Sequence, residues 1–399
     1  MKKYILLREI VEKTDPHMVS CMQCGSCNSA CHATSPKNGM GPEDLIRMIL
    51  LGHDEDALNS SWVWRCSLCG RCAQHCPMNI DIPGIMYFLR KCQKKHLAPY
   101  EIRDFLHRTL TSGNVLSLTP FEVIKTLNWI ETELRRSSGC NQHYIPIDAE
   151  GAELLVFVSS RDLKFNPRTI LALAHTLNIA KTNWTISSYG FEESNFGAML
   201  GDTDGENIIT MQKIQTMKNL GASGMLMDSC EHAFTRPEMG PRPLRQTEPD
   251  FWVTSTPTLI WSLMERGLIS PPKRPVNAHL VEEVVISDPC GTTRDSSPYK
   301  AVRAIFKWLG LKVHSLEPSP PNAICCGGGA GTSLLPLKSR MELTYAKAQQ
   351  LKELTPGSVV TTYCRQCAEI LREIIHTHHI GIQFIGIHEL LYEFLACHD

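Results

Sequence analysis

Five cysteines in the last third of the chain constrain its fold and chemistry most. They are spaced as a single Cys290, the segment Cys325-Cys326-Gly327-Gly328-Gly329, and the Cys-x-x-Cys pair of Cys364 and Cys367. Two adjacent thiols can face one metal only where the backbone bends sharply, and glycines permit such a bend. Five thiolates exceed the four ligands of a structural zinc site, and as soft ligands they suit an iron–sulfur centre. A zinc site with one spare thiol and a set of buried, unliganded cysteines are the alternatives.

Eight further cysteines form two runs near the N-terminus. Both have the spacing Cys-x-x-Cys-x-x-Cys-x-x-x-Cys, at Cys21, Cys24, Cys27 and Cys31 and again at Cys66, Cys69, Cys72 and Cys76. In bacterial ferredoxins with this spacing, the fourth cysteine of each run ligates the other cluster. By that rule one cubane [4Fe-4S] cluster is held by Cys21, Cys24, Cys27 and Cys76, and another by Cys66, Cys69, Cys72 and Cys31. His32 follows Cys31 where the pattern usually has proline.

The composition excludes several classes of protein. Of the 399 residues, 43% are hydrophobic and 20% are charged, which is ordinary for a globular protein that buries a core. A formal net charge of −1 gives no electrostatic reason to expect a nucleic-acid partner. No apolar run reaches the roughly 18 residues of a membrane span, and the N-terminus lacks the apolar core of a signal peptide. The 17 cysteines fall mostly in ligand spacings, so we expect a reduced, cytoplasmic compartment.

Hydrophobic periodicity predicts helices in the first third and alternating strands and helices after residue 150. Helices are expected over 42–51, from Pro83 to about Lys94 with Cys92 buried on it, and over 121–136. The first alternating segment is expected to have strands at 153–158, 184–186 and 225–227 and helices at 167–177 and 206–219. The second is expected to have strands at 284–287, 311–314 and 358–362, helices at 298–309, 338–353 and 366–377, and a closing strand and helix within 383–396. This alternation predicts parallel sheets flanked by helices.

The two alternating segments look like duplicates, offset by roughly 130–138 residues. Ser159-Ser160 falls where Pro289-Cys290 falls, and Ser187-Ser188-Tyr189-Gly190 falls where Cys325-Cys326-Gly327 falls. Cys230 aligns with the final Cys-x-x-Cys pair. By this alignment the first copy keeps one of the five cysteines. Serine is a poor substitute for thiolate at iron, so we expect no cluster there.

The five-cysteine pattern resembles the CCG domain of the heterodisulfide reductase B-subunit family. That resemblance implies that Cys290, Cys325, Cys326, Cys364 and Cys367 hold one non-cubane [4Fe-4S] cluster and are catalytic in disulfide cleavage. The two N-terminal runs, with their long insert, resemble the alpha-helical ferredoxin of the C subunit. The implied fold class is an α+β multidomain chain in which an alpha-helical ferredoxin precedes a duplicated α/β CCG domain with parallel sheets. The expected domains are a ferredoxin over 1–95, a helical connector over 96–150, a degenerate CCG half over 151–275 and an intact half over 276–399.

Further site residues follow from this resemblance and from position. Cys230 and His232, in the degenerate half, would face the intact site, where His232 could protonate a leaving thiolate near neutral pH. A core cysteine and a structural histidine are an equal alternative for these two. Gly327 and Gly328 would line the cluster. Arg294 and Arg365 would hold the substrate or tune the cluster by their charge.

The whole-chain order resembles a fused C and B subunit, most like the cytoplasmic catalytic subunit of the DsrK, TmcB and HmcF group in sulfate-reducer membrane redox complexes. The resemblance implies a thiol/disulfide oxidoreductase that exchanges electrons with membrane quinone or cytochrome subunits. Its substrate would be a small DsrC-like sulfur-carrier protein or another thiol. The chain would have no span of its own and would lie on the cytoplasmic face of the membrane through its partners. The alternative is an electron-transfer subunit of a flavin-dependent dehydrogenase of the glycolate or lactate type.

Overall fold

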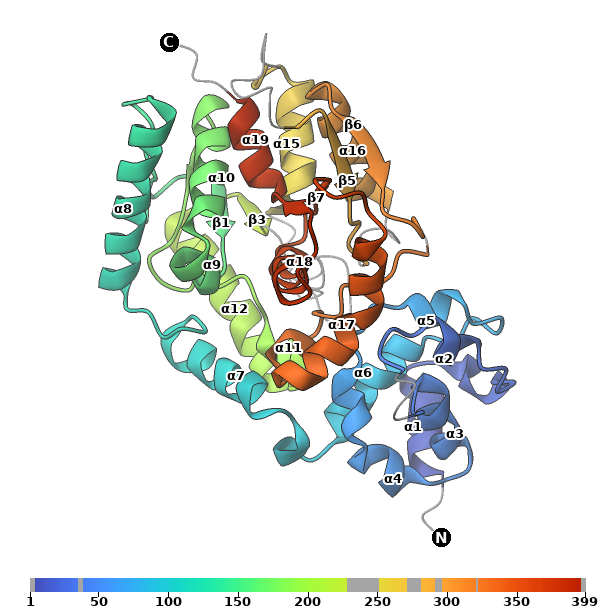
Figure 1. The fold of residues 1–399 in the computed structure, drawn as a ribbon. Coiled ribbons are helices and arrows are strands. Elements are labelled where there is room, and N and C mark those ends of the chain that lie inside the picture. The colour runs from blue at the N-terminus through green and yellow to red at the C-terminus, as the bar shows by residue number, and fades with distance from the viewer. Residues whose placement is uncertain are drawn as a thin grey trace.

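The computed structural model describes residues 4–34, 39–227, 251–270, 281–290, 296–320 and 322–395. The N-terminal residues form a helical lobe beside helix α17 (Leu337–Lys352), as Figure 1 shows. Its helices are α1 (Ile5–Lys13), η1 (Pro16–Ser20), α2 (Ser26–Ala30), α3 (Pro42–Leu50), α4 (Asp54–Asn59), η2 (Ser61–Arg65), α5 (Arg71–Gln74), α6 (Ile82–Cys92) and η3 (Lys95–Leu97).

Local chemistry sets the ends of the longer helices in this lobe. Helix α3 has a proline at its first position and two acidic residues, Glu43 and Asp44, in its first turn. Their negative charges interact favourably with the positive end of the helix dipole. Helix α6 begins after Asp81, whose carboxylate accepts a hydrogen bond from the Gly84 amide at 3.1 Å. Cys92, expected to be buried, is exposed. It is the last residue of α6 and lies beyond the core that buries Leu89.

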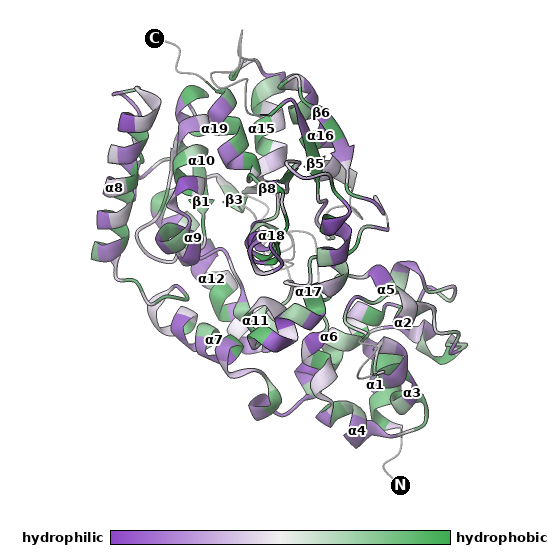
Figure 2. Cartoon of the chain, in the orientation of Figure 1, coloured by the Kyte–Doolittle hydropathy of each residue, from purple (hydrophilic) through white to green (hydrophobic). Residues whose placement is uncertain are grey.

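Two helices, α7 (Tyr100–Ser112) and α8 (Pro120–Ser138), connect the lobe to the sheets. Thr119 and Glu122 form a capping box at the start of α8. Figure 2 shows hydrophilic and hydrophobic residues interspersed along α8, and Val123, Leu127 and Ile130 belong to its buried face. The connector is therefore amphipathic, with one side packed on the sheet domain.

Two four-stranded, wholly parallel sheets follow, with the strand orders β2-β1-β3-β4 and β6-β5-β7-β8. The first half comprises β1 (Leu154–Phe157), α9 (Ser160–Phe165), α10 (Pro167–Ile179), β2 (Trp184–Thr185), α11 (Phe196–Leu200), α12 (Thr203–Leu220), β3 (Gly224–Met227), β4 (Trp252–Ser255) and α15 (Thr256–Glu265). The second comprises β5 (Glu283–Ile286), α16 (Ser296–Trp308), β6 (Lys312–Ser315), η4 (Thr332–Leu334), α17, β7 (Val359–Thr361), α18 (Arg365–Thr377), β8 (Gln383–Phe384) and α19 (Ile387–Phe394). Every residue of the inner strands β1 and β3 is buried, as expected for strands covered on both faces.

The two halves pack against each other and against the lobe. Helix α19 of the second half lies on α10 of the first, and α15 lies on α16 (Figure 1). The core of the lobe continues into the second half through Ala330, Leu335 and Leu343. None of the described helices is both long enough and apolar enough to cross a membrane.

The expected fold class, a helical N-terminal lobe followed by parallel-sheet α/β structure, is confirmed. Most predicted elements are present with ends shifted by one to three residues. The structure adds β4 and α15, which sequence periodicity did not predict. Strand β4 lies at the edge of its sheet and is only partly buried, so it lacks the continuous apolar run of the inner strands.

Candidate functional site

The two N-terminal cysteine runs adopt the same local conformation. A glycine between the second and third cysteine of each run, Gly25 or Gly70, has a φ of 76° or 77° and immediately precedes a short helix. Gln23 and Leu68, which precede the second cysteines, also share a left-handed conformation, with φ values of 51° and 53°. The repeated spacing therefore specifies a repeated loop that curls three cysteines around one centre.

The fourth cysteine of each run lies with the other run. Cys31 lies near Cys69 and Cys66. Burial raises the pKa of Cys31 to about 12, and the charges of Cys69 and Cys66 contribute to this increase. Cys76 lies near Cys21, whose pKa is raised by burial and, to a smaller extent, by the charge of Cys76. Two sets of four thiols result, a donor set that fits cubane clusters.

The five later cysteines converge at the carboxyl ends of the strands of the second sheet. Cys290 follows β5, Cys325 and Cys326 lie in the loop before η4 and α17, and Cys364 and Cys367 begin α18 after β7. All five are buried. The Sγ atoms of Cys325 and Cys290 are 4.0 Å apart, and those of Cys367 and Cys326 are 3.3 Å apart. Five buried, adjacent thiols are a donor set that fits an iron–sulfur cluster.

Close packing explains the glycines after the cysteine pair. Gly327 has a φ of 89°, and a Cβ atom there would lie 2.6 Å from the Leu343 carbonyl oxygen in α17. A Cβ atom at Gly328 would lie 2.4 Å from Ile370 in α18. Gly327 and Gly328 thus let two helices approach the cysteine pair, and the sharp bend turns both thiols inward.

Three thiols of the five-cysteine site, those of Cys325, Cys326 and Cys367, have strongly shifted pKa values. Contacts with Cys290, Cys326 and Cys69, together with burial, raise the pKa of Cys325 well above its usual range. Hydrogen bonds from Cys325 and Cys367 lower the pKa of Cys326 well below its usual range.

The lobe and the five-cysteine site meet directly. Cys69 packs against Cys290 and Cys325, and the ligand atoms of His32, Cys69 and Cys325 all lie within 4.8 Å of one another. The Ser67 hydroxyl lies 3.3 Å from the Cys325 sulfur and 3.2 Å from His32 Nε2. The second cysteine run therefore touches the five-cysteine site, with no intervening layer of protein.

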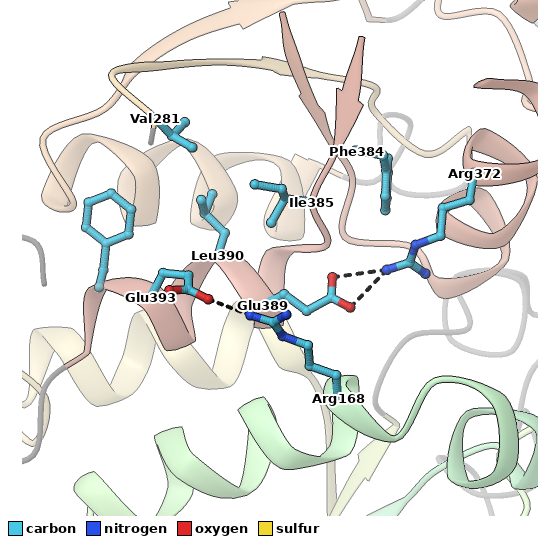
Figure 3. A pocket seen from close by; sticks show the side chains of 9 residues that line it. Arg168, Val281, Arg372, Phe384, Ile385, Glu389, Leu390 and Glu393 are labelled. Carbon is cyan, nitrogen blue, oxygen red and sulfur yellow. Dashed lines mark hydrogen bonds and ion pairs between the residues drawn. The ribbon is translucent and has the colours of Figure 1, made fainter. Parts of the chain in front are cut away.

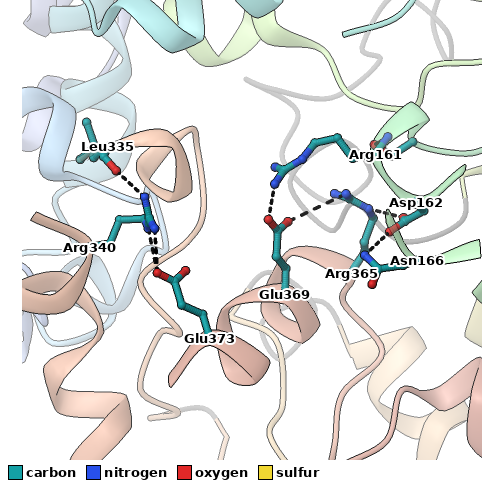
Figure 4. Close-up of polar contacts among 9 residues, drawn as sticks. Arg161, Asp162, Asn166, Leu335, Arg340, Arg365, Glu369 and Glu373 are labelled. Atoms are coloured by element: carbon teal, nitrogen blue, oxygen red, sulfur yellow. Dashed lines mark hydrogen bonds and ion pairs between the residues drawn. The ribbon is translucent and has the colours of Figure 1, made fainter. Parts of the chain in front are cut away.

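Arg365 lies at the contact between the two halves. Its side chain pairs with Asp162 of α9 and lies 3.9 Å from Glu369, which also pairs with Arg161 (Figure 4). The charges of Asp162 and Glu369 raise the pKa of Arg365 against the opposing effect of burial. Its charge is thus already matched by carboxylates. Cys230, His232 and Arg294, also expected at the site, lie outside the described residues.

Two cavities are relevant to access. One of about 20 Å³ lies beside Gly329 and Gln366 where the halves meet, with room for about one water molecule. A larger one of about 250 Å³ lies between β8 and α19, and its charged residues are paired, Arg372 with Glu389 and Arg168 with Glu393 (Figure 3). No cysteine lines either of these cavities. Cys364 lines a separate cavity of about 30 Å³, together with Asp162 and Arg365.

The degenerate half differs from the alignment expected from sequence. Lys213 and Lys347 are each the eleventh residue of the equivalent helices α12 and α17. When the two halves are aligned on these lysines, Cys325-Cys326-Gly327 corresponds to Phe191-Glu192-Glu193. The sequence alignment had instead matched it to Ser187 to Gly190. The expected alignment was wrong because the loop after β6 in the second half is longer than the loop after β2 in the first half. Buried Glu192 accepts a hydrogen bond from the Ser160 hydroxyl at 2.7 Å, so a carboxylate occupies this position.

Three residues near the five cysteines were missed by sequence reasoning: Ser67, Gln366 and Lys347. Ser67 and Gln366 lie inside cysteine spacings, yet nothing in those spacings distinguishes a contact residue from a spacer. Lys347 lies on a helix rich in polar residues, and nothing in its local sequence distinguishes it from an exposed lysine. The sequence did single out His32, because this residue stands where the ferredoxin pattern usually has proline.

Comparison with known proteins agrees with this arrangement. Residues 17–80 match the family model of a 4Fe-4S dicluster domain, and residues 284–372 match that of a cysteine-rich domain. A "probable membrane-anchored ferredoxin" of Chromohalobacter salexigens is 22% identical over 400 residues, covering 89% of this chain and 56% of that protein. An Hdr-like menaquinol oxidoreductase iron–sulfur subunit 2 of Archaeoglobus fulgidus is 25% identical, covering 53% of this chain and 43% of that protein.

A shorter match covers about a quarter of the chain. A C-type iron–sulfur subunit of the CoB–CoM heterodisulfide reductase of Methanocaldococcus jannaschii is 32% identical over 98 residues, covering 24% of this chain and 50% of that protein. The chain spans about half the length of the curated relatives it matches. The chain contains a [4Fe-4S] dicluster domain and is therefore an iron–sulfur protein. More particularly, it resembles heterodisulfide reductases, with a dicluster domain like that of the C-type subunit fused to a cysteine-rich domain.

Proposed function

We propose that this chain is a thiol/disulfide oxidoreductase of the heterodisulfide reductase type. The lobe would hold two cubane clusters and the five-cysteine site a non-cubane cluster. When bound, the clusters would supply single electrons to the site where a disulfide is reduced or formed. The observation that carries the proposal is the contact of Cys69 with Cys325 and Cys290. It joins the dicluster domain directly to the cysteine-rich domain, as an electron path requires.

We assign the ligand sets from the cysteine spacing and the family resemblance, and the contacts described above support them. One cubane is assigned to Cys21, Cys24, Cys27 and Cys76, and the other to Cys66, Cys69, Cys72 and Cys31. The non-cubane cluster is assigned to Cys290, Cys325, Cys326, Cys364 and Cys367. The domains are assigned as 1–95, 96–150, 151–275 and 276–399. When bound, these clusters would store and relay single electrons.

The residues of the chain prepare the site for this chemistry. Reduction of a disulfide to two thiols consumes two electrons and two protons. The bend at Gly327 directs the thiols of Cys325 and Cys326 inward, and burial of all five cysteines keeps bulk water from them. Gln366 Nε2 is buried without a hydrogen-bond partner among the described residues, and Gln366 lines the small cavity. In the proposed reaction this amide donates a hydrogen bond to a substrate sulfur at the five-cysteine site.

The substrate and partners are proposed on the family resemblance. A small DsrC-like sulfur-carrier protein would present the disulfide, and membrane quinone or cytochrome subunits would exchange electrons with the lobe. The relatives named as membrane-anchored and as a menaquinol oxidoreductase subunit support a membrane-linked complex. The chain would then lie at the cytoplasmic face of the membrane through those partners.

The decisive experiment is anaerobic iron and sulfide analysis of the full chain, combined with EPR of the oxidised protein. We expect about twelve irons per chain, from three clusters of four irons. Addition of 2-mercaptoethanol should produce a new EPR signal from the five-cysteine site, because a thiol can bind there. Only eight irons, or stoichiometric zinc with little iron, would contradict the assignment. Full iron with no thiol response and with copurifying flavin would favour the electron-transfer subunit of a flavin-dependent dehydrogenase.

A further inference from the structure

A buried lysine lies beside the five cysteines. Lys347, on α17, is 2% exposed, and its ammonium donates a hydrogen bond to the Ser287 hydroxyl at 3.4 Å. Burial lowers the pKa of Lys347, and negative charge on Cys326, Cys367, Cys325 and Cys290 opposes that effect. Among the described residues, no carboxylate forms an ion pair with it. Burying an unpaired ammonium costs several kcal/mol, so the thiol group opposite is the natural source of compensating negative charge.

The internal duplication supplies an independent observation. Lys213 occupies the same helical position in the degenerate half, is 4% exposed, and donates a hydrogen bond to the backbone oxygen of Glu193. The segment that replaces the cysteine pair in this half carries the buried carboxylates of Glu192 and Glu193. A buried cation therefore accompanies an acidic segment in one half and a thiol-rich segment in the other. If these lysines only filled space, methionine would serve equally well, because it has a similar length and no charge.

Building on the proposed function, we propose that Lys347 is a positioning residue whose positive charge sets the reduction potential of the cluster at the five-cysteine site. A bound cluster becomes more negative when it is reduced. A nearby ammonium stabilises the reduced form more than the oxidised form, so it raises the potential. Ser287 holds the ammonium in place at the end of β5, next to Asp288-Pro289-Cys290.

The test compares three variants of the full chain, purified anaerobically: Lys347→Met, Lys347→Arg and the matched Lys213→Met. Each is titrated electrochemically while EPR follows the three clusters. We compare the variants at the midpoint potential of the wild-type cluster in the five-cysteine site. At that potential, the ratio of reduced to oxidised cluster should be about tenfold lower in Lys347→Met than in the wild type. That change corresponds to about 59 mV for a one-electron couple. Lys347→Arg should stay near wild type, and Lys213→Met should leave this potential unchanged.

Several outcomes would overturn the inference. One is an unchanged potential in Lys347→Met with full iron content, and another is an equal shift in Lys213→Met. If Lys347→Met fails to assemble the third cluster, Lys347→Arg decides: assembly at near wild-type potential supports the charge, and failure of both variants overturns it. The proposed function fails separately, if the wild-type chain itself has no third cluster.

Discussion

At the scale of single residues, Cys326 is central to the five-cysteine site. Its sulfur lies 3.3 Å from that of Cys367, and hydrogen bonds from Cys325 and Cys367 lower its pKa. It is also the residue immediately before Gly327, so its direction is set by the bend that only glycine accommodates beside Leu343. A change at Cys326 alters the donor set without disturbing the lobe.

We therefore expect Cys326→Ser to abolish disulfide-linked turnover while both cubanes remain reducible. Four thiolates remain, so a cluster can still assemble, but its EPR signal should change. Turnover is measured anaerobically with reduced methyl viologen and 2-hydroxyethyl disulfide, and the cubanes by EPR after dithionite reduction. Cys92→Ser, at an exposed cysteine, is the control and should behave as wild type. Unchanged turnover in Cys326→Ser would contradict the assignment.

At the scale of elements, helix α19 is held against the first half by a pair of histidines. His175 of α10 bonds through Nε2 to the Leu395 carbonyl at 2.8 Å, and its ring lies 4.8 Å from that of Tyr392 and 5.1 Å from that of His143. Burial lowers the pKa of His175, and burial and then His175 lower the pKa of His143 to about 4. The folded protein thus holds both rings neutral.

Acidification should loosen α19. Because the folded state binds these protons less readily than the unfolded state, the stabilisation is complete above about pH 6.5 and is lost as the pH falls toward about 4. Hydrogen–deuterium exchange of the α19 amides, corrected for intrinsic rates, should therefore rise between pH 7 and pH 5.5. His175→Phe should weaken this pH dependence, and His314→Gln, at an exposed histidine, should not. A pH-independent exchange rate in the wild type would refute the expectation.

At the scale of the whole molecule, Arg90 of α6 joins three parts of the chain. It is 2% exposed and donates to the carbonyls of Cys66 at 2.6 Å, Met199 at 2.9 Å and Ala330 at 2.9 Å. Those carbonyls belong to the second cysteine run, the first half and the glycine segment of the second half. Its guanidinium also lies 4.7 Å from the Trp64 ring. One planar cation thus fixes the lobe over the five-cysteine site.

Arg90→Met should destabilise the protein by about 3 kcal/mol, because several buried carbonyls would lose their donor. The urea midpoint followed by tryptophan fluorescence should fall, and the magnetic interaction between the second cubane and the third cluster should weaken. Lys13→Met removes an exposed surface pair with Glu9 and should cost less than about 0.5 kcal/mol. Equal midpoints for the two variants would show that Arg90 is not a structural junction.

Local sequence determined much of this protein. Ligand spacing is a local property, so the two cysteine runs and the five later cysteines could be recognised without a fold. Hydrophobic periodicity is local as well, and it predicted the alternating strands and helices and hence the fold class. It failed at β4 and at Cys92, which lie at edges where burial depends on what packs nearby.

Tertiary structure alone decided which local sites face one another. The contacts of Ser67 and Cys69 with Cys325 join residues far apart in the chain, and no periodicity encodes such a pairing. The burial of Lys347 likewise depends on the approach of α17 to Gly327. The alignment of the degenerate half was settled by equivalent helices rather than by residue identity. Spacing therefore specified the ligands, and packing between distant segments specified their neighbours, because a side chain's environment comes from the whole fold.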